Sequence, residues 1–226
     1  MASFEAQVEA LAGLDITSSS NPTQNELSQF LKDGIVDVTT RIITLKPGDV
    51  NNFSRDSGLQ TSNGLDINGA KIISVVRADG VTAGNFRPCR KIDVSRQYLV
   101  TDTESLDYAS SYNPAFMEDE NGKISVFPTP SDNSSKDSYK VYYANNDHSY
   151  IDYECENINY FPNDKIYLVM IFAGIKSLEA KLAEYTIDEE DSELVQALSV
   201  NLGNLKQQYD TAFGLMAPKQ QAQGGR

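Results

Sequence analysis

The segment "NPAFMEDENGKISVFPTP", residues 113–130, gathers oxygen-bearing side chains around one glycine. A calcium-binding loop between two helices needs oxygen ligands at its positions 1, 3, 5 and 12, and a glycine at position 6. Placing Gly122 at position 6 puts Asp119 and Asn121 at positions 3 and 5. Position 1 then falls on Met117 and position 12 on a proline, and neither side chain can bind a cation. The ligand set is incomplete, so we predict that no metal binds here.

The same residues favour a β-hairpin. Asn121-Gly122 is the dipeptide that best supplies the two positive φ angles of a two-residue turn, and "KISVF" after it is β-branched and aromatic. Pro114, Pro128 and Pro130 oppose the helices that would flank a calcium loop. We predict two strands joined by a two-residue turn.

Other candidates for chemistry are weak. His148, the single histidine, lies in the polar stretch "NNDHSY", and the sequence shows no group that would orient it, so we expect a surface loop residue. The fingerprints of serine hydrolases, nucleotide-binding loops and zinc proteases are absent. The acidic run 188–191 suits the start of a helix, with Asp188 as N-cap, better than a metal cluster. We predict no enzyme, and no catalytic residue, cofactor or metal.

Aromatic rings are dense between residues 139 and 160. Such rings can form a stacking platform for sugars or bases, and interfaces between proteins use them as often. We favour packing or an interface over a ligand platform. The rings belong to Tyr139, Tyr142, Tyr143, Tyr150, Tyr153 and Tyr160.

The chain of 226 residues is acidic, with 19 Lys and Arg against 32 Asp and Glu and a net charge of -13. Tight binding of nucleic acid needs clustered cations. The charge therefore serves solubility, or it belongs to a surface that lies near DNA without holding it. Two cysteines give no disulfide framework. The longest apolar run, 167–175, is too short for a bilayer, and the first residues lack the pattern of a signal peptide. We expect a soluble protein made in a reducing cytoplasm.

Hydrophobic periodicity predicts helices at both ends of the chain. A short amphipathic helix is expected at 3–12, and a longer one at 23–45 starts with a capping box of Thr23 and Glu26. Near the C-terminus, Pro162 begins a helix that is apolar nearly all round, and a second helix follows the acidic run. The stripe of the first comprises Leu168, Ile171, Ile175, Leu178, Leu182 and Tyr185. The stripe of the second comprises Leu194, Leu198, Leu202, Leu205, Tyr209, Ala212 and Met216.

Between these helices the apolar segments shorten and turn residues become frequent. Strands are expected at 71–77, 115–119, 123–127 and 139–144, whereas 86–112 is ambiguous. The predicted fold is α+β, a helical bundle with a long C-terminal αα-hairpin and an inserted antiparallel β-rich region. The predicted domains are a helical core (1–46 and 161–216), a β-rich insertion (47–160) and a flexible C-terminal tail (217–226).

This layout resembles the head–tail connectors, or neck adaptors, of tailed bacteriophages. The resemblance rests on "NPAFMEDENGKISVFPTP" and "NYFPNDKIYLVMIFAGIKSLEAKLAEYTIDEEDSELV", which look similar to virion structural proteins of marine and cyanobacterial phages. It covers about residues 23 to 216. It implies a structural protein of the virion, at the interface of head and tail, that is made in the host bacterial cytoplasm.

The resemblance also implies partners. Such adaptors form a ring, generally twelve-fold, beneath the portal protein. They extend the DNA channel without binding DNA specifically, contact no membrane, and present a surface for a tail, nozzle or tail-tube component. A flexible terminus commonly becomes ordered on the portal. The matching portal-binding segment here comprises Ala217, Pro218, Lys219, Gln220, Gln221, Ala222, Gln223, Gly224, Gly225 and Arg226.

Other functions remain open at the level of sequence. A tail-completion or head-decoration protein would also be acidic and oligomeric. A carbohydrate-binding module would use the tyrosine-rich strands as a monomer. An enzyme that uses a pair of carboxylates is a further alternative, because such a pair is defined in space and not in sequence.

Overall fold

The structure is a computed structural model of the whole chain. It describes residues 2–82, 84–119, 122–131, 134–144, 148–185 and 192–216.

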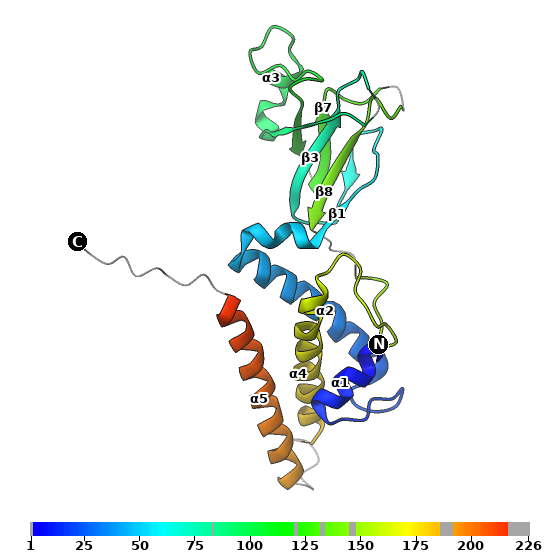
Figure 1. The fold of residues 1–226 in the computed structure, drawn as a ribbon, viewed down its shortest axis with the longest axis vertical. Helices are drawn as coiled ribbons and strands as arrows, with labels where there is room; N and C mark the ends of the chain where they lie inside the picture. Colours follow the sequence, from blue (N-terminus) through cyan, green and yellow to red (C-terminus); the bar gives the residue numbers. More distant parts are fainter. Residues whose placement is uncertain are drawn as a thin grey trace, which may run out of the picture. The chain divides into compact units, whose positions relative to one another are not determined.

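The fold is α+β, as predicted, and the chain divides into two compact units (Figure 1). A helical unit comprises residues 1–52 and 147–226, and a β unit comprises residues 53–146. The β unit is therefore shorter than the predicted insertion of 47–160. No helix among the described residues is long and apolar enough to cross a membrane.

Helix α1, Phe4–Ala12, begins at Ser3, whose hydroxyl accepts the N–H of Ala6, and ends at Gly13 in the left-handed region. Helix α2, Gln24–Leu45, has the predicted capping box, because Thr23 and Glu26 each bond the other's backbone N–H. Both predicted helices are confirmed. Each helix buries one apolar side in the helical unit.

An irregular segment, 148–161, belongs to the helical unit because it packs on α1 and α2. The carbonyls of Tyr153 and Cys155 accept the first N–H groups of α1, at 3.0 and 2.8 Å. The hydroxyl of Ser28 on α2 accepts the N–H of Tyr153, at 3.1 Å. Ile151 and Ile158 are buried. The segment thus supplies hydrogen-bond acceptors to the first N–H groups of α1, which have no acceptor within the helix.

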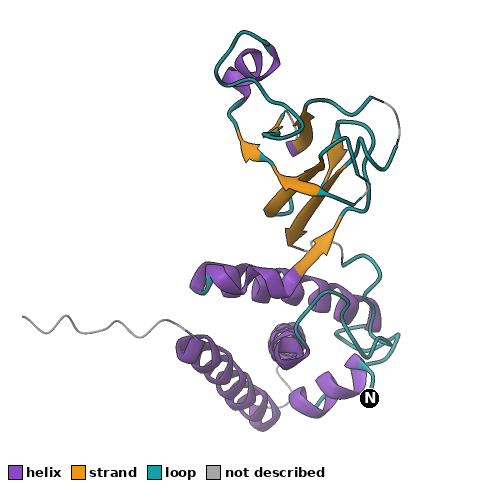
Figure 2. Ribbon diagram, turned by 45° about the horizontal axis from the view of Figure 1, so that its top comes forward, coloured by secondary structure: helices purple, strands orange, loops and turns teal. Residues whose placement is uncertain are grey.

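Helix α4, Ile166–Tyr185, lies at the centre of the helical unit. A 3-10 turn, Asn163–Lys165, leads into it, so Pro162 lies just before the helical residues and not within the first α-turn. Figure 2 shows α4 end-on, with α1, α2 and α5 around it, and α4 contacts all three. The expectation that this nearly uniformly apolar helix is packed on several sides is confirmed.

Helix α5, Ser192–Met216, runs back along α4 and completes the predicted αα-hairpin. Its buried residues are Leu198, Leu205, Tyr209 and Phe213. The predicted stripe therefore needs two corrections, because Leu194 is exposed and Phe213 is buried. The acidic run 188–191, including the predicted N-cap Asp188, lies outside the described residues.

The described strands of the β unit form two four-stranded sheets. The first sheet has the order β1-β8-β3-β4 and the second β2-β7-β6-β5. The first comprises β1 Ser54–Asp56, β8 Tyr139–Ala144, β3 Ile72–Ala78 and β4 Phe86–Pro88. The second comprises β2 Leu65–Asp66, β7 Lys123–Phe127, β6 Ala115–Glu118 and β5 Arg90–Lys91. A 3-10 helix, Pro47–Phe53, precedes β1.

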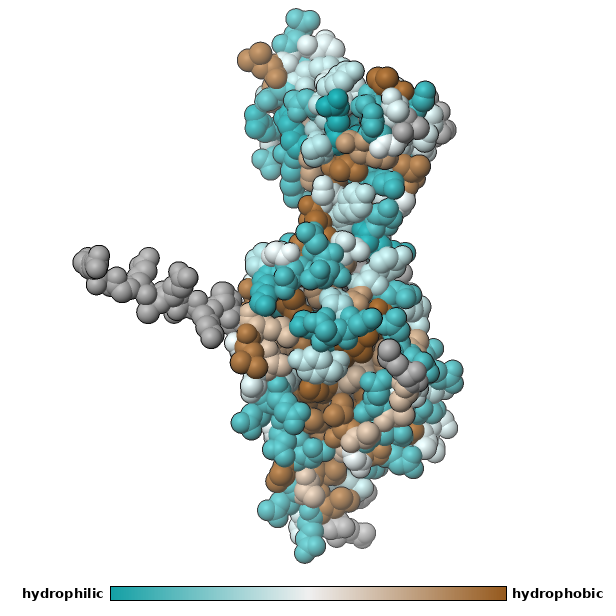
Figure 3. Space-filling model, in the orientation of Figure 1, coloured by the Kyte–Doolittle hydropathy of each residue, from teal (hydrophilic) through white to brown (hydrophobic). Residues whose placement is uncertain are grey.

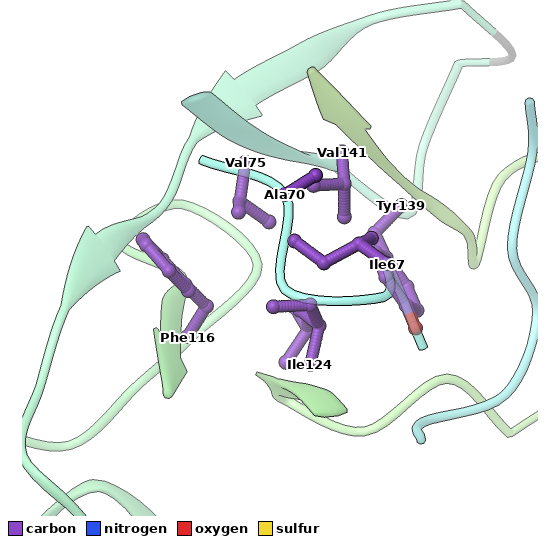
Figure 4. Packing of buried hydrophobic residues seen from close by; sticks show 8 residues of the cluster. Ile67, Ala70, Val75, Phe116, Ile124, Tyr139 and Val141 are labelled. Atoms are coloured by element: carbon purple, nitrogen blue, oxygen red, sulfur yellow. The ribbon is translucent and has the colours of Figure 1, made fainter. Parts of the chain in front are cut away.

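The core of the β unit lies between the two sheets. Side chains from both sheets and from the loop after β2 point toward one another in Figure 4. The cluster comprises Ile67, Ala70, Val75, Phe116, Ile124, Val126, Tyr139 and Val141. Strands β4 and β5 are separated by Cys89 alone, so one extended segment passes from the first sheet to the second. This segment joins the two sheets at one side of the core.

The predicted hairpin at 113–130 is confirmed, but its turn is longer than predicted. Strands β6 and β7 pair in a register that places Glu118 opposite Ile124. The N–H of Asp119 donates to the carbonyl of Lys123 at 2.9 Å, which leaves three residues in the loop. Gly122 has a φ of +73°. Asn121, the first residue of the predicted two-residue turn, lies outside the described residues.

The ambiguous stretch 86–112 holds β4, β5, a 3-10 turn Val94–Arg96 and a short helix α3, Gln97–Thr101. Strand β5 pairs with β6 in parallel. The prediction of a purely antiparallel β region is therefore wrong at this strand. A small cluster of buried residues supports this stretch. It comprises Ile92, Val100, Ala109, Ala115, Met117 and Phe127.

Candidate partner-binding site

The predicted portal-binding residues, Ala217 to Arg226, lie outside the described residues. The structure does show the surface from which they continue, the C-terminal end of α5. This end packs against the last turns of α2 and the first turn of α4. This end of α5 is therefore the described surface that is nearest in sequence to the predicted segment.

A polar and aromatic cluster fixes α5 to α2. The hydroxyl of Tyr209 donates to the Oδ2 atom of Asp37 at 2.7 Å, and the Nε atom of Arg41 lies 2.9 Å from the same oxygen. The guanidinium of Arg41 covers the rings of Tyr209 and Phe213, with distances of 5.1 and 5.4 Å to their centres. Burial, and then the hydrogen bond to Asp37, raise the pKa of Tyr209.

Two grooves flank the end of α5. The first, between α2 and α5, has a volume of about 470 Å³. It is lined by Thr40, Arg41, Thr44, Leu45, Phe213 and Gly214. The second, between α4 and α5, has a volume of about 480 Å³. It is lined by Tyr167, Gln207, Gln208, Thr211, Ala212, Leu215 and Met216.

Hydrophobic side chains remain accessible around these grooves. Leu215 is 84 % exposed, and Tyr167 is exposed as well. Figure 3 shows hydrophobic residues at the surface where α5 ends. Exposed apolar surface with polar residues around it is typical of a protein interaction site. We call the groove between α2 and α5 the α2–α5 groove.

A second exposed apolar feature lies in the β unit. The loop 102–108 follows α3 and stands away from the sheets in Figure 1. It is closed at its base by the N–H of Ala109, which donates to the carbonyl of Val100 at 3.0 Å. Within this loop Leu106 is fully exposed. We call residues 102–108 the Leu106 loop.

The Leu106 loop is held in shape next to its exposed leucine. Arg90 donates to the carbonyl of Asp107, and Arg96 lies 2.8 Å from the carboxylate of the same residue. The N–H of Asp107 donates to the hydroxyl of Ser105 at 3.1 Å. Because both neighbours of Leu106 are fixed, the apolar side chain is presented to solvent by an ordered loop.

The structure corrects the interpretation of His148 and separates the tyrosines. His148 is 7 % exposed and therefore buried, not a surface residue. Residues 139–144 form β8 of the β unit, whereas the later tyrosines lie in the irregular segment of the helical unit. Within β8, Tyr139 is buried and Tyr143 packs on the same core, while the intervening Tyr142 belongs to the opposite face. Packing accounts for two of these rings.

The described residues of the pseudo-calcium loop take part in packing and hydrogen bonding, and both cysteine thiols have raised pKa values. Met117 is buried in the small cluster below α3, and the carboxylate of Asp119 accepts the hydroxyl of Ser125 at 3.2 Å. Across the described ranges, no three His, Cys, Asp or Glu side chains come together so as to hold a metal ion. Burial raises the pKa of the Cys89 thiol to about 12, and burial also raises the pKa of Cys155. Both thiols are protonated at neutral pH.

Sequence reasoning missed the α2–α5 groove and the Leu106 loop. The groove joins residues about 170 positions apart, such as Thr44 and Phe213, and no local pattern reveals that proximity. The loop did leave a signal. Its segment "DTESLD" holds one leucine among three acidic residues, so that side chain had no apolar stripe in which to be buried.

Comparisons with known proteins do not identify the chain. No protein-family model matches it, and no curated protein sequence matches it significantly.

Proposed function

We propose that this protein is a structural component of a phage virion, a head–tail adaptor. It forms a ring beneath the portal, extends the DNA channel and offers a docking surface to the next tail component. The observation that carries the proposal is the pair of exposed apolar features, the α2–α5 groove and the Leu106 loop, in two separate units of the chain. A subunit with two such features can contact two neighbours at once, as a ring requires.

The distribution of charge supports passage of DNA next to this protein. Residues 1–52 and 147–226 carry 20 acidic and 9 basic residues, whereas residues 53–146 carry 12 and 10. The excess negative charge therefore belongs to the helical unit. A wall of that charge repels phosphate, while a cationic wall would retain it. The helical unit is the part of the proposed ring that would face the DNA.

The layout of the chain supports the same proposal through its resemblance to neck adaptors. A helical bundle is interrupted by a β-rich insertion and closes with a long αα-hairpin. A tail-completion or head-decoration protein is the alternative within virion proteins. It differs in its partner and in the symmetry of its assembly.

Native mass spectrometry and negative-stain microscopy test the proposal, with the full chain alone and mixed with portal rings. We expect a ring of fixed subunit number that stacks coaxially on the portal. A complex with capsid proteins but not with the portal would favour head decoration. A chain that stays monomeric at high concentration and ignores the portal would contradict the adaptor function.

A further inference from the structure

We propose that the Leu106 loop of one copy docks in the α2–α5 groove of a second copy. This inference rests on the proposed function, because it names the contact through which the ring closes. It is carried by the shape and charge of the two surfaces.

The first surface is an ordered apolar projection. Leu106 lies between Ser105 and Asp107, and the loop carries bonds from two arginines at Asp107. Leu106 is fully exposed, so its apolar side chain is removed from water only when a partner covers it. Because the loop is already ordered, docking costs less conformational entropy than docking of a flexible segment would.

The second surface is a groove of matching chemistry. Leu45 and Phe213 give the α2–α5 groove apolar walls, and its volume of about 470 Å³ accommodates one leucine with its neighbours. Arg41 in its wall is held over the rings of Tyr209 and Phe213. The groove is therefore preformed, and a partner need not open it.

The charges around the two surfaces are opposite. The segment 102–107 contains Asp102, Glu104 and Asp107 and no basic residue. The described segments 40–48 and 211–216, which line and flank the groove, contain two basic residues and no acid. Those residues are Arg41, which pairs with Asp37, and the exposed Lys46. Because each copy has a net charge of -13, two copies repel one another overall. This pairing of an acidic projection with a basic rim favours approach in one orientation.

The contact is heterologous, because the two copies contribute different surfaces. Each copy then keeps one free projection and one free groove, so that contacts continue from copy to copy. A heterologous contact closes into a ring when its rotation divides a full turn, and otherwise gives an open filament. The inferred contact therefore accounts for a ring from a single repeated interface.

Disulfide trapping tests the contact directly. Leu106→Cys and Thr44→Cys would be introduced into two separate preparations of the full chain, both in a Cys155→Ser background, and mixed under mild oxidation. We expect a disulfide between the two different chains. Val81→Cys replaces Leu106→Cys in the control, because Val81 is 61 % exposed on another loop of the same unit. Equal trapping with Val81→Cys would overturn the inference.

Charge exchange tests the orientation. Lys46→Glu alone should weaken self-association by about tenfold or more in sedimentation velocity, since like charges then meet. Combining it with Glu104→Lys should restore association. Leu106→Asp should abolish it, and Val81→Asp should leave it unchanged.

The outcomes separate this inference from the proposed function. If Leu106→Asp still forms the wild-type ring on the portal, the inferred contact is wrong and the adaptor function stands. If the ring forms but Leu106→Asp no longer binds the portal, the loop contacts the portal and not a second copy, which also overturns the inference. If the wild-type chain forms no ring with or without the portal, both proposals fail.

Discussion

At the scale of single residues, the most demanding group is the buried guanidinium of Arg77 in β3. It donates to the carbonyls of Pro128 and Ala78 and pairs with the carboxylate of Asp137. A buried cation is tolerated only when its N–H groups are paired. Arg77 therefore ties the loop before β8 to the end of β7.

Removing the carboxylate that pairs with Arg77 should lower the free energy of unfolding. Asp137→Ala leaves the charge of Arg77 buried, and we expect the free energy of unfolding to fall by about 3–5 kcal/mol. The matched control is Asp56→Ala, which breaks the more exposed pair with Lys140 and should cost at most about 1 kcal/mol. Urea denaturation of both variants measures the difference. Equal losses would show that Arg77 does not depend on Asp137.

The capping box of α2 should make stability depend on acid pH. Hydrogen bonds from the backbone N–H and then the hydroxyl of Thr23 lower the pKa of Glu26 below 4.5. A carboxyl with a depressed folded-state pKa contributes stability that is complete above its unfolded pKa and is lost as pH falls through the folded value. Glu26→Gln keeps the box but cannot titrate. We expect its melting temperature to fall less than that of the parent chain between pH 5 and pH 3, and parallel profiles would contradict this.

At the scale of helices, two glycines differ in how closely other atoms approach them. A Cβ atom at Gly34 of α2 would lie 3.0 Å from the Cδ1 atom of Phe172 and 3.3 Å from the Cγ1 atom of Val169. A Cβ atom at Gly203 of α5 would meet no described atom within 4 Å. The first glycine allows α2 and α4 to approach closely, whereas the second only lowers helix propensity.

Alanine at these two positions should therefore have opposite effects. Gly34→Ala should destabilise the chain by about 1–3 kcal/mol through overpacking. Gly203→Ala should stabilise it by up to about 1 kcal/mol, since alanine favours a helix over glycine. Thermal unfolding at a fixed pH compares the two. A stabilised Gly34→Ala variant would mean that Phe172 moves aside freely.

The αα-hairpin should lose stability when its buried stripe is shortened. Leu178 and Leu198 are both buried, and truncation of either to alanine should cost about 2–5 kcal/mol. Val200→Ala on the exposed side of α5 is the control and should change stability by no more than about 0.5 kcal/mol. Two leucine variants that melt like the parent would exclude this stripe from the core.

At the scale of the whole molecule, the segment 217–226 should serve binding and not folding. Its charged residues are Lys219 and Arg226, and its glutamines, alanines and glycines offer little apolar surface. Deleting it should leave the melting temperature unchanged and weaken co-sedimentation with portal rings. Undiminished co-sedimentation would move the portal contact to the helices or to the β unit.

The sequence alone determined the features that depend on neighbouring residues. The capping box of Thr23 and Glu26 and the stop at Gly13 are formed by groups three or four positions apart, so their residue types predict them. The helical stripes follow the same spacing. The α+β class followed from these patterns and from the short β-branched segments between them.

Only the tertiary structure decided the features that join distant residues. The bond between Tyr209 and Asp37 spans 172 positions, and the pair of Arg77 and Asp137 spans 60. The parallel pairing of β5, the burial of His148 and the α2–α5 groove depend on such contacts. Their free energy is gained only when the chain has collapsed, so no local spacing records them. The candidate binding surfaces belong to this second class, because they lie where separate elements meet.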